Sequence, residues 1–200
     1  MTLADVPGHA ATYLLLAFSA LAAGSAGGIT AGVLGVQFAP LRPVLLALGN
    51  LARVVPSLAV LTFMLPLLGV GFLPAFAALM LLAAAPVLIN TDVGLRSAPA
   101  AALDAAAGMG MTRAQTLLRV QWPLALPVIF TGVRTAATEV IASAVLASFV
   151  GAGGLGEFIT SGLQANDART LWIGVVSIGI IAVIAEIILA ALQRRIGEYA

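Results

Sequence analysis

The sequence predicts an all-α integral membrane protein with about five transmembrane helices, organised as one permease-type membrane domain over residues 1–200. Of the 200 residues, 62% are hydrophobic and only 8% are charged, and the mean hydropathy is +1.13. In a soluble domain, roughly a quarter of the residues are charged, and they cover its surface. Because this chain has far fewer, most of its surface must face lipid.

Five apolar stretches are the predicted spans, since a membrane helix needs about 20 apolar residues. In the first stretch, Gly24, Gly28 and Gly32 recur every four residues, and small residues at this spacing allow close helix packing in lipid. Pro56 and Pro66 interrupt the second stretch. The stretches are 11–36, 44–68, 72–90, 124–150 and 171–192.

The arginines predict the orientation, because basic residues are retained on the cytoplasmic side of a membrane. With five spans, one side of the membrane receives only Arg169, whereas six arginines fall on the other side. We therefore expect the N-terminus outside and the C-terminus in the cytoplasm. The other side receives Arg42, Arg96, Arg113, Arg119, Arg194 and Arg195.

The longest polar stretch, residues 91–123, is longer than a simple connection between two helices requires. Residues 100–108 are strong helix formers, and Thr112 is suited to cap a second short helix over 113–120. Gly108 and Gly110 would allow a sharp turn between the two. The prediction is a rigid knob (residues 100–120) at the membrane surface, of the kind that a soluble partner could push against.

The knob resembles the EAA motif of ABC importer permeases: Glu-Ala-Ala, three residues, Gly, nine residues, Ile-x-Leu-Pro. Here Asp104-Ala105-Ala106, Gly110 and Val120-Gln121-Trp122-Pro123 stand at the same spacing, with Asp for Glu, Val for Ile and Trp for Leu. In that family the loop docks on the ATP-hydrolysing subunit. The resemblance implies that the coupling residues are Asp104, Ala105, Ala106, Gly110, Met111 and Thr112.

Four further segments are similar to the glycine betaine, carnitine and choline importers, and methionine importer permeases share part of the pattern. An osmoprotectant permease is the first reading, and a permease of the methionine type is the alternative. The segments are 55–59, 108–112, 124–127 and 149–156.

The resemblance implies a bacterial inner-membrane transport subunit, which is not itself an enzyme. Its expected partners are ABC ATPase subunits, a second permease subunit (identical or different), an extracytoplasmic substrate-binding protein and membrane lipid. The chain contains no lysine and no Gly-x-x-x-x-Gly-Lys-Ser/Thr motif. We therefore expect no cofactor in this chain, with ATP and magnesium held by the partner ATPase.

Three charged residues fall inside predicted spans: Arg53 in the second, and Arg134 and Glu139 in the fourth. A charge in lipid is costly, so each should face protein or water. Arg134 and Glu139 are about 140° apart around a helix, so they do not form a pair on one face. We expect Glu139 either to pair with Arg53 or Arg134 across a helix contact or to line the transport pathway.

Two other function classes remain as alternatives. A channel or secondary transporter without an ATPase would need charges or broken helices at mid-membrane, for which Glu139 and Pro56 are the support. A membrane enzyme would need a nucleophile–base pair or a metal cluster. The chain has no cysteine and one histidine, His9, and its net charge of +1 argues against a nucleic-acid partner.

Overall fold

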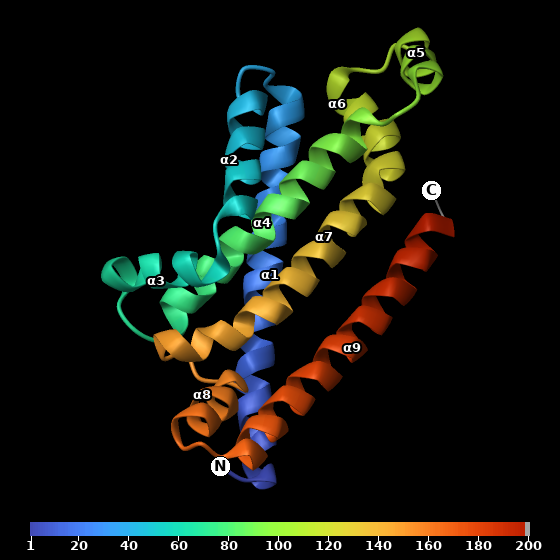
Figure 1. Cartoon of the computed structure of the whole chain (residues 1–200). Coiled ribbons are helices and arrows are strands. Elements are labelled where there is room, and N and C mark those ends of the chain that lie inside the picture. Colours follow the sequence, from blue (N-terminus) through green and yellow to red (C-terminus); the bar gives the residue numbers. More distant parts are fainter. Residues whose placement is uncertain (199–200) are drawn as a thin grey trace.

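The computed structural model describes residues 1–198, and within that range the regular structure is entirely helical. In chain order the elements are η1 (Leu3–Asp5), α1 (Val6–Gln37), α2 (Arg42–Val54), α3 (Ser57–Leu68), α4 (Phe72–Arg96), α5 (Ala100–Gly108), α6 (Arg113–Thr116), the π-helical η2 (Leu117–Gln121), α7 (Trp122–Ala144), η3 (Val145–Val150), α8 (Gly156–Gln164) and α9 (Ala168–Glu198). Figure 1 shows the N-terminus and α8 at one end of the bundle. The short helices α5 and α6 lie at the other end, and α9 runs back toward it.

Within the described residues, four helical segments are long and apolar enough to cross a membrane: Leu3–Gln37, Phe72–Arg96, Arg113–Val150 and Ala168–Ile196. The pair α2 and α3 meets the same test together, but it is bent by 105°. The structure therefore has four spans, or five with the bent pair, which confirms the all-α membrane fold with about five spans.

The bend between α2 and α3 occurs at Pro56. Proline forces the preceding residue out of the helical conformation, and Val55 is extended, with φ −72° and ψ 125°. In Figure 1, α2 runs beside α1, whereas α3 turns away across the bundle. The second expected interruption, at Pro66, was wrong: this proline lies inside α3, which continues to Leu68.

Small residues allow α1 and α4 to pack closely, as predicted. A β-carbon placed on Gly24 would come within 2.5 Å of the Met80 carbonyl oxygen, and one on Gly28 within 2.6 Å of the Ala84 carbonyl oxygen. Gly32 lies just as close to α4. These three glycines are therefore packing positions, and they keep the backbone of α1 in contact with that of α4.

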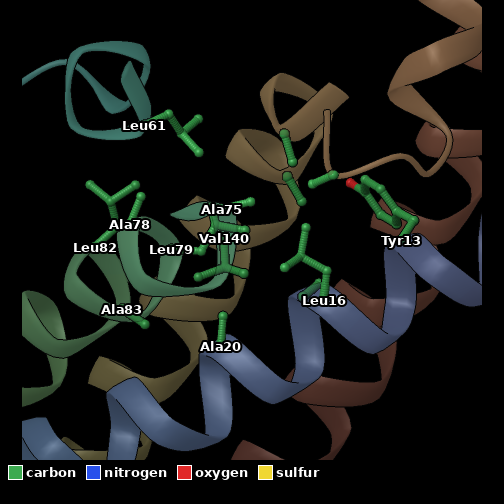
Figure 2. Packing of buried hydrophobic residues seen from close by; sticks show 14 of the residues in the cluster. Tyr13, Leu16, Ala20, Leu61, Ala75, Ala78, Leu79, Leu82, Ala83 and Val140 are labelled. Atoms are coloured by element: carbon green, nitrogen blue, oxygen red, sulfur yellow. The ribbon is translucent and has the colours of Figure 1, made fainter. Parts of the chain in front are cut away.

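The core lies where α1, α3, α4 and α7 meet, and it is built mostly from alanine, leucine and valine. The hydroxyl of the buried Tyr13 donates a hydrogen bond to the carbonyl of Ile141, which satisfies its polar atom inside the bundle. Figure 2 shows part of this cluster, with Leu61 of α3 pointing toward the buried face of α4. The labelled members are Tyr13, Leu16, Ala20, Leu61, Ala75, Ala78, Leu79, Leu82, Ala83 and Val140.

The polar loop is shorter than the predicted 91–123. Helix α4 extends to Arg96, six residues beyond its predicted end, and a continuous helix begins at Arg113, ten residues before the predicted end of the loop. Of the predicted loop, only residues 97–112 therefore lie outside the spanning helices. Helix α9 is also longer than the predicted 171–192, since it begins at Ala168 and reaches Glu198.

Two internal contacts explain why α4 continues through polar residues. The hydroxyl of Thr91 donates to the Val87 carbonyl, 2.7 Å away, within its own helix. The carboxylate of Asp92 accepts two hydrogen bonds from Arg42 at the start of α2. Because these partners satisfy the side chains inside the protein, the sequence polarity here does not mark a loop.

Candidate functional site

The knob (residues 100–120) has the helix–turn–helix form that the sequence predicted. At the end of α5, the Gly110 amide donates to the Ala107 carbonyl at 2.9 Å and the Met111 amide to the Ala106 carbonyl at 3.0 Å. Gly110 has φ +71°, a conformation that favours glycine. These bonds close the chain into a tight turn that ends α5 and starts α6.

Thr112 caps the second helix of the knob, as predicted. Its hydroxyl accepts a hydrogen bond from the Gln115 amide at 3.3 Å, and the Gln115 side chain accepts one from the Thr112 amide at 2.9 Å. This reciprocal arrangement satisfies amides that would otherwise lack partners. The turn therefore has a defined shape before any partner binds.

The structure brings the six motif residues together but exposes them unequally. Asp104, Ala105 and Gly110 are exposed, whereas Ala106 is completely buried. Met109, between Gly108 and Gly110, is 68% exposed, so an apolar side chain lies at the tip of the turn. The knob thus presents one carboxylate and an apolar tip to a partner.

The root of the knob is joined to the spanning helices. Leu117 packs with Leu95 of α4 and Ile129 of α7 in a small apolar cluster. The side-chain amide of Gln121 donates from Nε2 to the Leu95 carbonyl at 3.1 Å. A force applied to the knob therefore reaches α4 and α7 through direct contacts.

The helix between the knob and α7 contains one π-helical turn, η2, where the sequence predicted only a short helix ending at Val120. Beside it, a groove of about 760 Å³ separates the knob from the end of α1, and Phe38, Leu103 and Met111 are among its lining residues. The π-helical turn carries no sequence signature that could have predicted it.

Arg42 and Asp92 form an ion pair that the sequence did not reveal. The guanidinium Nε lies 2.7 Å from Asp92 Oδ1 and one terminal nitrogen lies 2.8 Å from Oδ2. The side chain of Asp92 is only 4% exposed. Both residues had been assigned to loops on the same side, 50 positions apart, so nothing in the sequence connected them.

Arg134 has a different partner from the expected one. It pairs with Glu186 of α9 and also donates to the Gln193 side-chain oxygen at 2.6 Å. The expected pair with Glu139 is not formed. The correction follows from helix geometry: the face of α7 that carries Arg134 is turned toward α9, and Glu139 is on another face.

Arg53 and Glu139 lie in one pocket, of about 350 Å³, at the bend between α2 and α3. Ser57 and Ser143 add two hydroxyl groups to its lining. Among the ion pairs within residues 1–198, neither charge takes part, so the expected Arg53–Glu139 pair is not formed although the two residues share a pocket.

At the opposite end of the bundle, His9 of α1 contacts Glu157 of α8. The imidazole Nε2 and the carboxylate Oε2 are 3.1 Å apart, and the ring of His9 packs edge-on against Phe158. No pattern in the sequence indicated a role for His9. This contact joins the N-terminal helix to α8, which follows a glycine-rich turn.

Known proteins are similar to this chain over most of its length. A family model described as "Binding-protein-dependent transport system inner membrane component" matches residues 9–198. The carnitine transport permease protein OpuCB of Listeria monocytogenes is 37% identical over 184 residues, which cover 92% of this chain and 84% of that protein. The glycine betaine/carnitine/choline transport system permease protein OpuCB of Bacillus subtilis is 40% identical over 147 residues, 74% of this chain and 68% of that protein.

Among solved structures, the chain resembles the MetNI methionine ABC transporter in an inward-facing conformation. The TM-score is 0.85, and the match covers 98% of this chain and 99% of that chain. The identity is 21%, so this likeness concerns the fold alone.

Proposed function

Because this chain belongs to the family of binding-protein-dependent transport system inner membrane components, we propose that it forms the membrane passage of an ATP-driven importer for quaternary ammonium osmoprotectants. As a member of that family it is a multi-pass membrane transport subunit. The finer proposal concerns its solute, its partners and its orientation.

One observation supports the coupling role above all others: a preformed exposed knob is attached to two spanning helices. Asp104 and Met109 are exposed on it, and Leu117 and Gln121 join its root to α4 and α7. A soluble ATPase subunit that bound the knob could move both helices at once. A connector without a partner would gain nothing from such a rigid form.

The proposed partners are therefore two ATPase subunits, a second permease subunit and an extracytoplasmic binding protein that delivers the solute. ATP and magnesium belong to the ATPase subunits, and this chain holds neither. Docking would use Asp104 and its neighbours in the knob, and closure of the ATPase pair would transmit its motion through η2 to α7. The permease itself would then open toward the binding protein.

The proposed orientation places the knob and the C-terminal end of α9 in the cytoplasm and the N-terminus outside. Figure 1 shows the knob and the end of α9 toward one end of the bundle and the N-terminus at the other. Arg169 is at the start of α9, on the N-terminal side, whereas Arg96, Arg113 and Arg119 lie around the knob. This bias supports the assignment to the bacterial inner membrane with the knob inside.

The proposed solute class rests on the sequence relatives. The two OpuCB proteins, at 37% and 40% identity, are named for carnitine, glycine betaine and choline, which share a trimethylammonium group. The methionine transporter matches at 21% identity, which supports the fold and gives no reason to prefer methionine as the solute.

Copurification tests the assembly. An affinity-tagged form of this chain is expressed in its own host, together with the proteins encoded beside its gene. The purified chain should retain an ATPase subunit that binds nucleotide. A well-folded chain that transports solute without any such subunit would instead support the channel or secondary transporter. A matched control is Arg169→Gln, a change at the opposite end of the bundle from the knob, which should retain the ATPase fully.

A further inference from the structure

The pocket at the α2–α3 bend brings two charged side chains and a hydroxyl together. Arg53 lies in the last turn of α2 before the bend, and Glu139 lies in α7 on the opposite wall. Ser57, the first residue of α3, lines the same pocket. A positive group, a negative group and a hydroxyl therefore face one space of about 350 Å³.

Two arginines of the membrane helices are already neutralised by carboxylates. Arg42 is held by Asp92, and Arg134 by Glu186. By contrast, within the described part of the chain Arg53 is exposed and Glu139 half-buried, with neither in an ion pair. Charges inside an apolar span need water, protein or a solute as their partner. The pocket that they share is the place where such a partner would bind.

We propose that this pocket is a transit site for a small zwitterion, which would place its cationic end at Glu139 and its carboxylate at Arg53. This inference rests on the proposed function, since it names the part of the permease that contacts the solute. The volume of about 350 Å³ falls within the roughly 300–1,000 Å³ range of small-molecule sites. Both charges of a zwitterion would be compensated at once, so the site and the solute together would be neutral.

The same chemistry explains why binding here would be weak. Tight recognition of a quaternary ammonium group uses aromatic rings placed around it. The residues that line this pocket include no aromatic ring. Glu139 would attract the trimethylammonium group only through charge, which suits a site that must release its solute to the cytoplasm.

The bend at Pro56 places Arg53 at the edge of the pocket. If α2 and α3 formed one straight helix, Arg53 and Ser57 would be neighbours on one face, one turn apart. The bend of 105° instead directs α3 away, and the last turn of α2 lines the pocket together with residues of α7. A movement of α3 relative to α2 would therefore change the shape of the pocket.

The test compares a zwitterion with a cation that shares its quaternary ammonium group. Uptake of glycine betaine and of choline is measured in vesicles that contain the complete transporter with its ATPase and binding protein. Glycine betaine carries a carboxylate and choline does not. Arg53→Gln should lower the ratio of glycine betaine to choline uptake roughly tenfold, as expected for loss of one charged hydrogen-bonding partner.

Glu139→Gln should lower the uptake of both solutes roughly tenfold and leave their ratio close to the wild-type ratio, because both carry the ammonium group. Arg53→Lys should restore much of the preference for glycine betaine, since it keeps the positive charge. Arg169→Gln removes an arginine outside the pocket and should leave the ratio unchanged.

Other outcomes would overturn the proposal. If Arg53→Gln takes up both solutes at wild-type rates, with an unchanged ratio of glycine betaine to choline uptake, Arg53 does not contact the solute. Loss of assembly in both variants, measured by the mass of the purified complex, would show that the two charges bind the second permease subunit instead. If the wild-type complex takes up neither solute, the proposed function itself fails, and this inference fails with it.

Discussion

Two adjacent glycines on α1 should respond oppositely to the same substitution. A β-carbon on Gly27 meets nothing within 4 Å, whereas one on Gly28 would lie 2.6 Å from the Ala84 carbonyl oxygen and 2.8 Å from the Val87 β-carbon. Both contacts are with groups that cannot rotate away, since one is backbone and the other is the first atom of a branched side chain. Gly28→Ala therefore forces α1 and α4 apart.

The magnitude follows from the difference between the two variants. Each replaces glycine by alanine within one helix, so each gains about 1 kcal/mol of intrinsic helix preference. Only Gly28→Ala adds the overpacking cost, about 1–3 kcal/mol for one extra carbon in a well-packed contact. Gly28→Ala should thus be less stable than Gly27→Ala by about 1–3 kcal/mol.

Thermal unfolding of the purified protein in one detergent measures this difference. For a chain of about this size, 1 kcal/mol corresponds to a change in Tm of about 2–4 °C. We expect Gly27→Ala to unfold at or above the wild-type temperature, and Gly28→Ala to unfold about 2–12 °C below Gly27→Ala. Equal melting temperatures for the two variants would refute the close α1–α4 contact.

Three further predictions concern coupling, orientation and the α7–α9 contact. Gly110→Asp should insert normally but lose transport and ATPase binding, because it adds a charged side chain to the exposed turn of the knob, where φ is +71°; normal transport by a well-expressed variant would contradict the coupling role. Single cysteines, Arg113→Cys and Arg169→Cys, have no background in this chain, and an impermeant maleimide should label intact cells only at position 169; labelling at 113 would reverse the orientation. Arg134→Gln and Glu186→Gln should each lower Tm, and the double variant should recover most of the loss because no unpaired charge remains; additive losses would show that the pair contributes nothing.

The spans and the knob could be predicted from the sequence because both depend on local signals. Apolar length identifies a membrane helix, and the Thr112 cap and the Gly110 turn act over three or four residues. Pro56 likewise predicted the interruption between α2 and α3. The size of the bend, 105°, depends on packing and could not be predicted.

The partners of the charged residues could not be predicted, because each pair joins distant parts of the chain. Arg42 finds Asp92 and Arg134 finds Glu186, 50 and 52 positions away. The polarity of Thr91 and Asp92 also misplaced the end of α4, since it resembled a loop until their internal partners were known. A polar residue in the sequence indicates only that its burial would cost free energy. The structure shows which partner inside the protein offsets that cost.

We propose that ATP hydrolysis by a partner drives solute through this chain by way of the knob. The most direct test measures glycine betaine uptake by vesicles that contain the complete transporter, with wild-type permease or with Gly110→Asp. We predict that wild-type uptake requires hydrolysable ATP on the side of the knob and that Gly110→Asp abolishes it while the protein remains folded. Uptake that continues without ATP, or at the wild-type rate in Gly110→Asp, would contradict the account.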